Sequence, residues 1–172
     1  AEARRPARVD AQGLMIPLSE QDPALWNARL VAGGRTFLER AQSKSRRSLQ
    51  AQLHAAWCVR SSLAEPPPWR TILRLYDRLL TIQDDAVVRL NRAVALAEVA
   101  GPGEALAELD RLNHPGLARF TPWLAARADL LRRLDRHDEA RAAYAALLAE
   151  DVPEAERRWL LRQVAHLPSP RA

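Results

Sequence analysis

The residues that could do chemistry are few and widely separated in this sequence. There is one cysteine, Cys58, and there are four histidines, His54, His114, His137 and His166. No two histidines have the spacing of a helical zinc site, and a thiol nucleophile needs a base held beside it. We therefore predict no catalytic residue, no metal site and no cofactor, and we expect that the protein is not an enzyme.

The aromatic and glycine-rich segments offer two further possibilities. The five tryptophans could form a stacking platform for nucleotides, but each begins or lines a predicted amphipathic helix, which favours packing between helices. The tryptophans are Trp26, Trp57, Trp69, Trp123 and Trp159. The Gly101–Gly103 segment lacks the preceding strand and the spacing of a phosphate-binding loop. We interpret it as a linker between helices.

Length and composition limit the classes of protein to be considered. The 172 residues include 26 basic and 21 acidic side chains, and 48% of them are hydrophobic, enough for a folded domain with its own core. The longest strongly apolar run, residues 93–97, is far shorter than the roughly 18 residues of a membrane-spanning helix. The first ten residues contain three arginines and lack the apolar segment of a signal peptide. We therefore expect a cytoplasmic protein that does not associate with membranes.

Abundant alanine, leucine and arginine, all strong helix formers, predict an all-α protein. Prolines and glycines divide the sequence into about eight predicted helices with short loops. The Asp22–Pro23 pair is expected to start the first helix, which would run to about Ala41 and bend or contact another helix at Gly33–Gly34. Residues 1–20 are expected to form an extended linker with a turn near Gly13.

The chain contains an internal repeat with a separation of 35 residues. Similar residues recur at this separation through two predicted helices: Ala93 with Ala128, Leu96 with Leu131, Val99 with Leu134, Ala105 with Ala140, Leu109 with Tyr144, and Leu112 with Leu147. A helix pair that recurs in this way predicts a helical-repeat protein. One period earlier, Cys58 takes the place of Ala93. We therefore expect Cys58 to be the small residue at which two helices pack.

The last repeat resembles a tetratricopeptide repeat, in which small residues let paired helices approach and an aromatic residue fills the groove between pairs. We therefore predict a right-handed superhelix of antiparallel helical hairpins. The hairpins are expected at about 48–83, 86–113 and 119–150, with a capping helix at 153–167. The resulting helical-repeat domain would span 21–167.

One candidate for partner binding is Asn91. Tetratricopeptide-like repeats use asparagine on an inner helix to bind peptide carboxylates, and Asn91 lies in the most apolar predicted helix. The accompanying lysines are absent, however. This absence favours a structural hydrogen bond for Asn91.

Basic residues are concentrated in one part of the chain. Residues 29–74 contain nine basic and two acidic side chains, whereas residues 75–156 contain ten basic and fifteen acidic ones. This asymmetry favours docking on a partner of complementary charge, although a solvated helical face would have the same composition. The candidate partner-binding arginines are Arg35, Arg46, Arg47, Arg60, Arg70 and Arg74. No helix-turn-helix with a basic recognition helix is evident, so this chain is not expected to read DNA sequence.

Four runs carry a resemblance to a known family. They are Arg-Arg-Pro-Ala-Arg-Val-Asp from Arg4, Leu-Ser-Glu-Gln-Asp from Leu18, Leu-Asn-Arg-Ala-Val-Ala from Leu90, and residues 128–134. With them, nearly the whole chain resembles the C-terminal extension of certain bacterial extracytoplasmic-function RNA polymerase sigma factors. One departure is Asp135, where glycine is usual in the turn between paired helices.

The resemblance implies a tetratricopeptide-like domain that follows the promoter-binding sigma domains and takes the place of a separate anti-sigma factor. Since no promoter-binding region is found, we expect the chain to be part of a longer protein whose missing N-terminal domains contact DNA. The expected function is a protein-interaction and regulatory domain for transcription initiation. Its partners would be the sigma domains of the same parent chain, RNA polymerase or a signalling protein. The alternative is a stand-alone repeat scaffold or co-chaperone that binds peptide termini.

Overall fold

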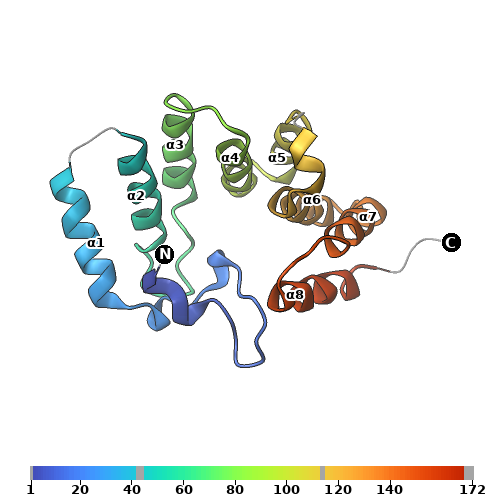
Figure 1. Cartoon of the computed structure of the whole chain (residues 1–172), viewed down its shortest axis with the longest axis horizontal. Coiled ribbons are helices and arrows are strands. Elements are labelled where there is room, and N and C mark those ends of the chain that lie inside the picture. The colour runs from blue at the N-terminus through green and yellow to red at the C-terminus, as the bar shows by residue number, and fades with distance from the viewer. Residues whose placement is uncertain (1, 42–44, 113–114, 169–172) are drawn as a thin grey trace. The chain divides into compact units, whose positions relative to one another are not determined.

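The computed structural model describes residues 2–41, 45–112 and 115–168, and within these ranges it contains eight α-helices and no β-strand (Figure 1). This confirms the prediction of an all-α protein with about eight helices. The chain forms two compact units, Ala1–Asp85 and Ala86–Ala172. The domain limits and the superhelical handedness stay predictions.

The first unit contains α1 (Ala28–Ala41), α2 (Arg46–Trp57) and α3 (Trp69–Leu80), with α2 between the other two helices (Figure 1). Helices α2 and α3 bury Leu49, Ile72 and Leu79. Helix α2 ends at Trp57, well before Pro66–Pro68, and these prolines come directly before α3, with Pro68 as its N-cap residue. The rings of Trp57 and Trp69 meet edge to face, 5.0 Å apart, across the loop between the two helices. This contact supports the packing interpretation for these two tryptophans.

Three short 3-10 helices precede α1: η1 (Glu2–Ala7), η2 (Leu18–Glu20) and η3 (Pro23–Leu25). The expected turn is present at Gly13, whose φ of 76° is readily adopted only without a Cβ atom. The Asp10 carboxylate accepts hydrogen bonds from the amides of Gln12 and Leu14 beside it. Ala7 is fully buried, so this segment packs on the helices of the first unit.

The predicted start of the first helix is wrong. The Asp22 carboxylate caps only η3, through the amide of Ala24 at 2.9 Å. The backbone is then extended at the buried Trp26, and the Asn27 side chain caps α1 by accepting from the Leu30 amide at 3.0 Å. Placing the indole in the core requires this interruption. The contact expected at Gly33–Gly34 is also absent, because no described atom lies near either glycine.

The second unit contains five α-helices and one 3-10 helix among its described residues. These are α4 (Ala86–Val99), α5 (Pro102–Asp110), η4 (Pro115–Arg119), α6 (Thr121–Arg133), α7 (His137–Leu148) and α8 (Glu154–Ala165). Successive helices pack on one another in chain order, and α4 also contacts α6.

The 35-residue repeat is visible in this unit as a repeat of structure. Helices α4 and α6 start at Ala86 and Thr121, and α5 and α7 start at Pro102 and His137. Three of the six repeated pairs are fully buried at both positions. They are Ala93 with Ala128, Ala105 with Ala140, and Leu109 with Tyr144. The sequence repeat therefore does correspond to a repeated helix pair.

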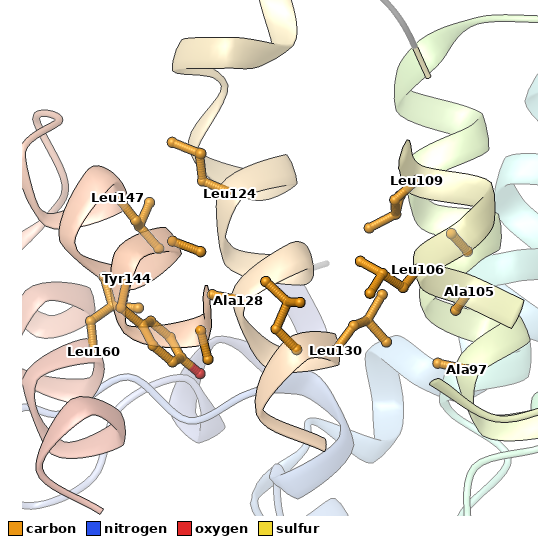
Figure 2. Close-up of a cluster of buried hydrophobic side chains, with 14 of the residues drawn as sticks. Ala97, Ala105, Leu106, Leu109, Leu124, Ala128, Leu130, Tyr144, Leu147 and Leu160 are labelled. Carbon is orange, nitrogen blue, oxygen red and sulfur yellow. The ribbon is translucent and has the colours of Figure 1, made fainter. Parts of the chain in front are cut away.

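The core of the second unit is continuous across its helices. Figure 2 shows α6 in the middle, with Tyr144 and Leu147 of α7 and Leu160 of α8 on one side. Leu106 and Leu109 of α5 lie on its other side. The small Ala128 leaves room for the Tyr144 ring, as the resemblance to tetratricopeptide repeats implies.

The first unit departs from the repeat at Cys58. Helix α2 ends at Trp57, and Cys58 is its C-cap residue, half-buried and outside the helix. The prediction that Cys58 is a small packing residue within a helix pair is therefore wrong. The cause is local, because residues 58–68 form a turn and an extended segment in place of the additional helical turns.

Candidate interaction surface

Five of the six candidate arginines lie exposed on the first unit. Arg35 belongs to α1, Arg46 and Arg47 to the first turn of α2, and Arg70 and Arg74 to α3. Arg46, Arg47 and Arg70 have no ion-pair or hydrogen-bond partner for their side chains among the described residues. Their positive charge is therefore open to a partner.

Arg60, in contrast, is an internal residue. Only 6% of its surface is exposed. Its guanidinium donates to the carbonyl oxygens of Ser19 and Glu65, both at 2.7 Å, and of Leu63 at 3.4 Å. These carbonyls lie outside α-helices, where they lack helical partners, and the five donors of arginine suit them. Arg60 holds the N-terminal segment to the loop after α2, so its prediction as an exposed partner-binding residue is corrected.

Two other arginines make single contacts and stay exposed. Arg35 donates from Nη2 to the carbonyl oxygen of Cys58 at 2.6 Å, which links α1 to the end of α2. Arg74 donates to the Thr71 hydroxyl at 2.9 Å on the same helix. Both guanidinium groups keep further donors for a ligand.

The arginines of the second unit differ from those of the first, because many of them form ion pairs with acidic residues of the same unit. The pairs are Arg92 with Glu108, Arg119 with Glu150, Arg127 with Asp110, Arg133 with Glu98, Arg136 with Glu139, and Arg158 with Glu154. The charge asymmetry seen in the sequence is thus accompanied by an asymmetry in pairing. Unpaired positive charge is concentrated on the first unit.

Helix α1 adds an apolar stripe to this basic unit. Leu30, Gly33, Gly34 and Phe37 recur every three or four residues and so share one side of the helix, named here the α1 face. Phe37 is 76% exposed and Leu30 is 50% exposed. No residue of α1 whose burial is described belongs to the buried class. An exposed phenylalanine on a unit that also carries unpaired arginines is typical of a protein-interaction surface.

Sequence reasoning missed the α1 face. For this helix, the sequence predicted only a bend or a helix contact at Gly33–Gly34, and Leu30 and Phe37 were not singled out. The available signal was Gly33–Gly34, since two adjacent glycines remove side chains that would fill a helix–helix contact. The structure shows open space beside both residues.

Asn91 lies exposed on α4, in the second unit, whereas the candidate arginines belong to the first. Val87 and Val94 flank it at helical spacing and are also exposed. The Asn91 side chain makes no hydrogen bond within the described part of the chain. The expected structural hydrogen bond is therefore absent, and the amide is open to a peptide.

Among the described residues, the histidines and the cysteine form no group that could hold a metal ion. His54 lies four residues before Cys58, but no group of three potential ligands occurs among residues 2–41, 45–112 and 115–168. His166 Nδ1 lies 2.6 Å from the carbonyl oxygen of Arg162. His114, and Lys44 of the basic segment, lie outside the described residues. In the same ranges, no helix has the length and hydrophobicity needed to span a membrane.

Comparison with known proteins gives two similarities. Residues 1–42 match the model of a family of unknown function, DUF6596. These residues include the N-terminal segment and α1, and so contain the α1 face. An uncharacterised protein of Rhizobium meliloti (strain 1021) is 33% identical over 168 residues, which are 96% of this chain and 39% of that protein. No solved structure matches.

Proposed function

We propose that this chain is the regulatory helical-repeat domain of an extracytoplasmic-function sigma factor and that it acts by binding protein partners through its first unit. The resemblance of the motifs from Arg4, Leu18 and Leu90 supports the family. The repeated helix pairs of the second unit support a tetratricopeptide-like fold. The greater length of the Rhizobium relative is compatible with further domains in that protein.

The observation that carries the proposal is the combination of the α1 face with unpaired arginines. An apolar anchor such as Phe37 supplies binding energy when a partner covers it, whereas arginines favour an acidic partner and speed its approach. Arg46, Arg47 and Arg70 supply such charge on the same unit. The partner would therefore be an acidic protein surface with an apolar recess. Sigma domains, RNA polymerase and a signalling protein are the candidate sources, and each would place the protein in the cytoplasm.

The parent gene offers a test in cells. A reporter driven by the parent's own promoter is compared for the intact protein and for a protein that lacks residues 1–172. The proposal expects a changed output or a changed response to the inducing signal. Unchanged output together with an unchanged response would contradict it. Immunoblots of the sigma domains ensure that equal amounts of protein are compared.

The alternative, a scaffold or co-chaperone that binds peptide termini, is favoured by one observation. The Asn91 amide is exposed between Val87 and Val94 and has no hydrogen bond among the described residues. Fluorescence polarisation with acidic C-terminal peptides tests this function, with Asn91→Ala as the site variant. Binding that Asn91→Ala weakens would favour the alternative, and absence of binding would count against it.

A further inference from the structure

A small cavity lies in the first unit, between the start of α1 and the end of α2. Its volume is about 230 Å³, and Trp26, Val31, Arg35, Cys58 and Arg60 contribute to its walls. None of the described residues that line it is acidic. Two guanidinium groups therefore border one cavity with no carboxylate to balance them.

A third arginine, Arg4, does not line the cavity but interacts electrostatically with Cys58, which does. Arg4 is only 8% exposed, and its Nη1 atom has no hydrogen-bond partner among the described residues. Burial lowers the pKa of Arg4, and the nearby Cys58 opposes this shift. A buried cationic donor without a partner carries a desolvation cost, which an anion would offset.

Trp26 adds a neutral donor that is also unsatisfied. Its Nε1 atom is buried without a hydrogen-bond partner among the described residues. Arg35 and Arg60 donate to backbone carbonyls at 2.6–2.7 Å, and these bonds hold both guanidinium groups in place beside the cavity. The surroundings thus offer fixed donors and positive charge. None of the described lining residues has an acidic side chain, so the fitting ligand is an acceptor-rich anion.

The size and the walls of the cavity narrow the ligand further. A volume of about 230 Å³ corresponds to about eight water molecules at roughly 30 Å³ each, which suits a ligand smaller than a nucleotide. Trp26 and Val31 also line the cavity and add apolar surface to it. A ligand that fits both the size and the walls of the cavity would combine one carboxylate or phosphate group with a short apolar part.

We propose that this cavity binds a small organic anion, with its charged group toward Arg35 and Arg60 and its apolar part against Trp26. This goes beyond partner docking, because it gives the first unit a small-molecule site. Val31 and Arg35 both come from α1. An occupant would therefore connect α1, which carries the α1 face, to the end of α2.

The single cysteine makes occupancy measurable. Alkylation of Cys58 by iodoacetamide, a neutral reagent, is followed by mass spectrometry on the full chain. Phosphate, pyruvate and benzoate are added separately up to about 10 mM at constant ionic strength, a range that detects millimolar affinity. The proposal expects at least one of them to slow the alkylation saturably, by about threefold or more. Phosphate and the two carboxylates distinguish the two kinds of anionic group.

Two variants separate a specific site from a general effect of charge. Arg35→Gln removes a charged wall residue that is exposed, so the fold is retained, and it is expected to raise the dissociation constant about tenfold. Arg29→Gln on the same helix does not touch the cavity and should leave binding unchanged. The proposal is overturned if none of the three anions slows the alkylation. The proposal is also overturned if the anions slow the alkylation of Cys58 equally in Arg35→Gln and in the unaltered chain. It is likewise overturned if chloride slows the alkylation as much as they do.

Discussion

Arg133 Nη1 lies 2.5 Å from Glu98 Oε1, and the two residues are 35 positions apart, so the ion pair joins equivalent positions of consecutive repeats. Glu98 belongs to α4 and Arg133 to α6. Both side chains are about two-thirds buried, and Arg133 also donates to the Ala97 carbonyl. The pair holds neighbouring repeats in register on the surface of the second unit.

This ion pair should contribute measurably to stability. A double-mutant cycle with Glu98→Gln and Arg133→Gln is expected to give a coupling free energy of about 0.5–1 kcal/mol, above that of a fully exposed pair. Urea unfolding gives the free energy of unfolding of the unaltered chain, the two single variants and the double variant. The exposed pair of Arg158 and Glu154 within α8 is the control and should give about 0.3 kcal/mol. Equal couplings for the two pairs would contradict a special role for the 35-residue pair.

The small residue at the centre of the second unit should tolerate no enlargement. Ala128 is fully buried beside Tyr144, so Ala128→Leu is expected to lower the free energy of unfolding by about 1–3 kcal/mol through overpacking. Ala145→Leu on the exposed side of α7 adds the same atoms outside the core and should change stability by less than about 0.5 kcal/mol. Thermal and urea unfolding compare the two. A neutral Ala128→Leu would show that the packing around α6 is loose.

The turn between α6 and α7 is expected to improve with glycine. Asp135 has a φ of 57°, in the left-handed region that costs residues with a Cβ atom about 1 kcal/mol or more. The amides of Asp135 and Arg136 donate to the carbonyls of Arg132 and Leu131, which is a Schellman helix end that normally uses glycine. Asp135→Gly should therefore raise the free energy of unfolding by up to about 1 kcal/mol. A loss of stability would mean that the aspartate side chain compensates for the strain.

The positive charge of Arg4 should have a measurable effect on the protonation of His54. Burial, with a contribution from the positive charge of Arg4, lowers the pKa of His54. Because the folded state binds this proton less readily than the unfolded state, stability is lost as the pH falls through the ordinary histidine value of about 6.5. Arg4→Gln is expected to move the His54 midpoint upward in an NMR titration and to reduce this acid sensitivity. An unchanged midpoint would place Arg4 too far away to act on His54.

The second unit could be predicted from the sequence more fully than the first. In the second unit, the residues that match at a separation of 35 correctly predicted a repeated helix pair. The same small and large residues must recur wherever the same helix pair packs. The repeat failed at Cys58 because the proline-containing loop after α2 replaced helical turns. Arg60 was misassigned for a related reason. Its partners are backbone carbonyls from segments distant in sequence, which no residue pattern reveals.

The exposed residues were the hardest to predict. Phe37 has the type and spacing of a core residue, and only the absence of a helix against the α1 face distinguishes it. Asn91 was expected to make a structural hydrogen bond because the lysines of a carboxylate-binding site are absent, yet it lies on the exposed side of α4. Exposure depends on which neighbours are absent. The spacing of apolar residues shows which side of a helix could be packed against a neighbour. It does not show whether a neighbouring helix is present there.

Direct binding to purified parent sigma domains, alone and with core RNA polymerase, tests the central claim most directly. Biolayer interferometry compares the intact chain with Phe37→Ser and with the double variant Arg46→Glu, Arg47→Glu. Leu161→Ser changes an equally apolar exposed residue on α8 and is the control. We predict binding that each first-unit change weakens about tenfold or more and that Leu161→Ser leaves unchanged. No binding, or equal binding by all variants, would contradict a docking function of the first unit.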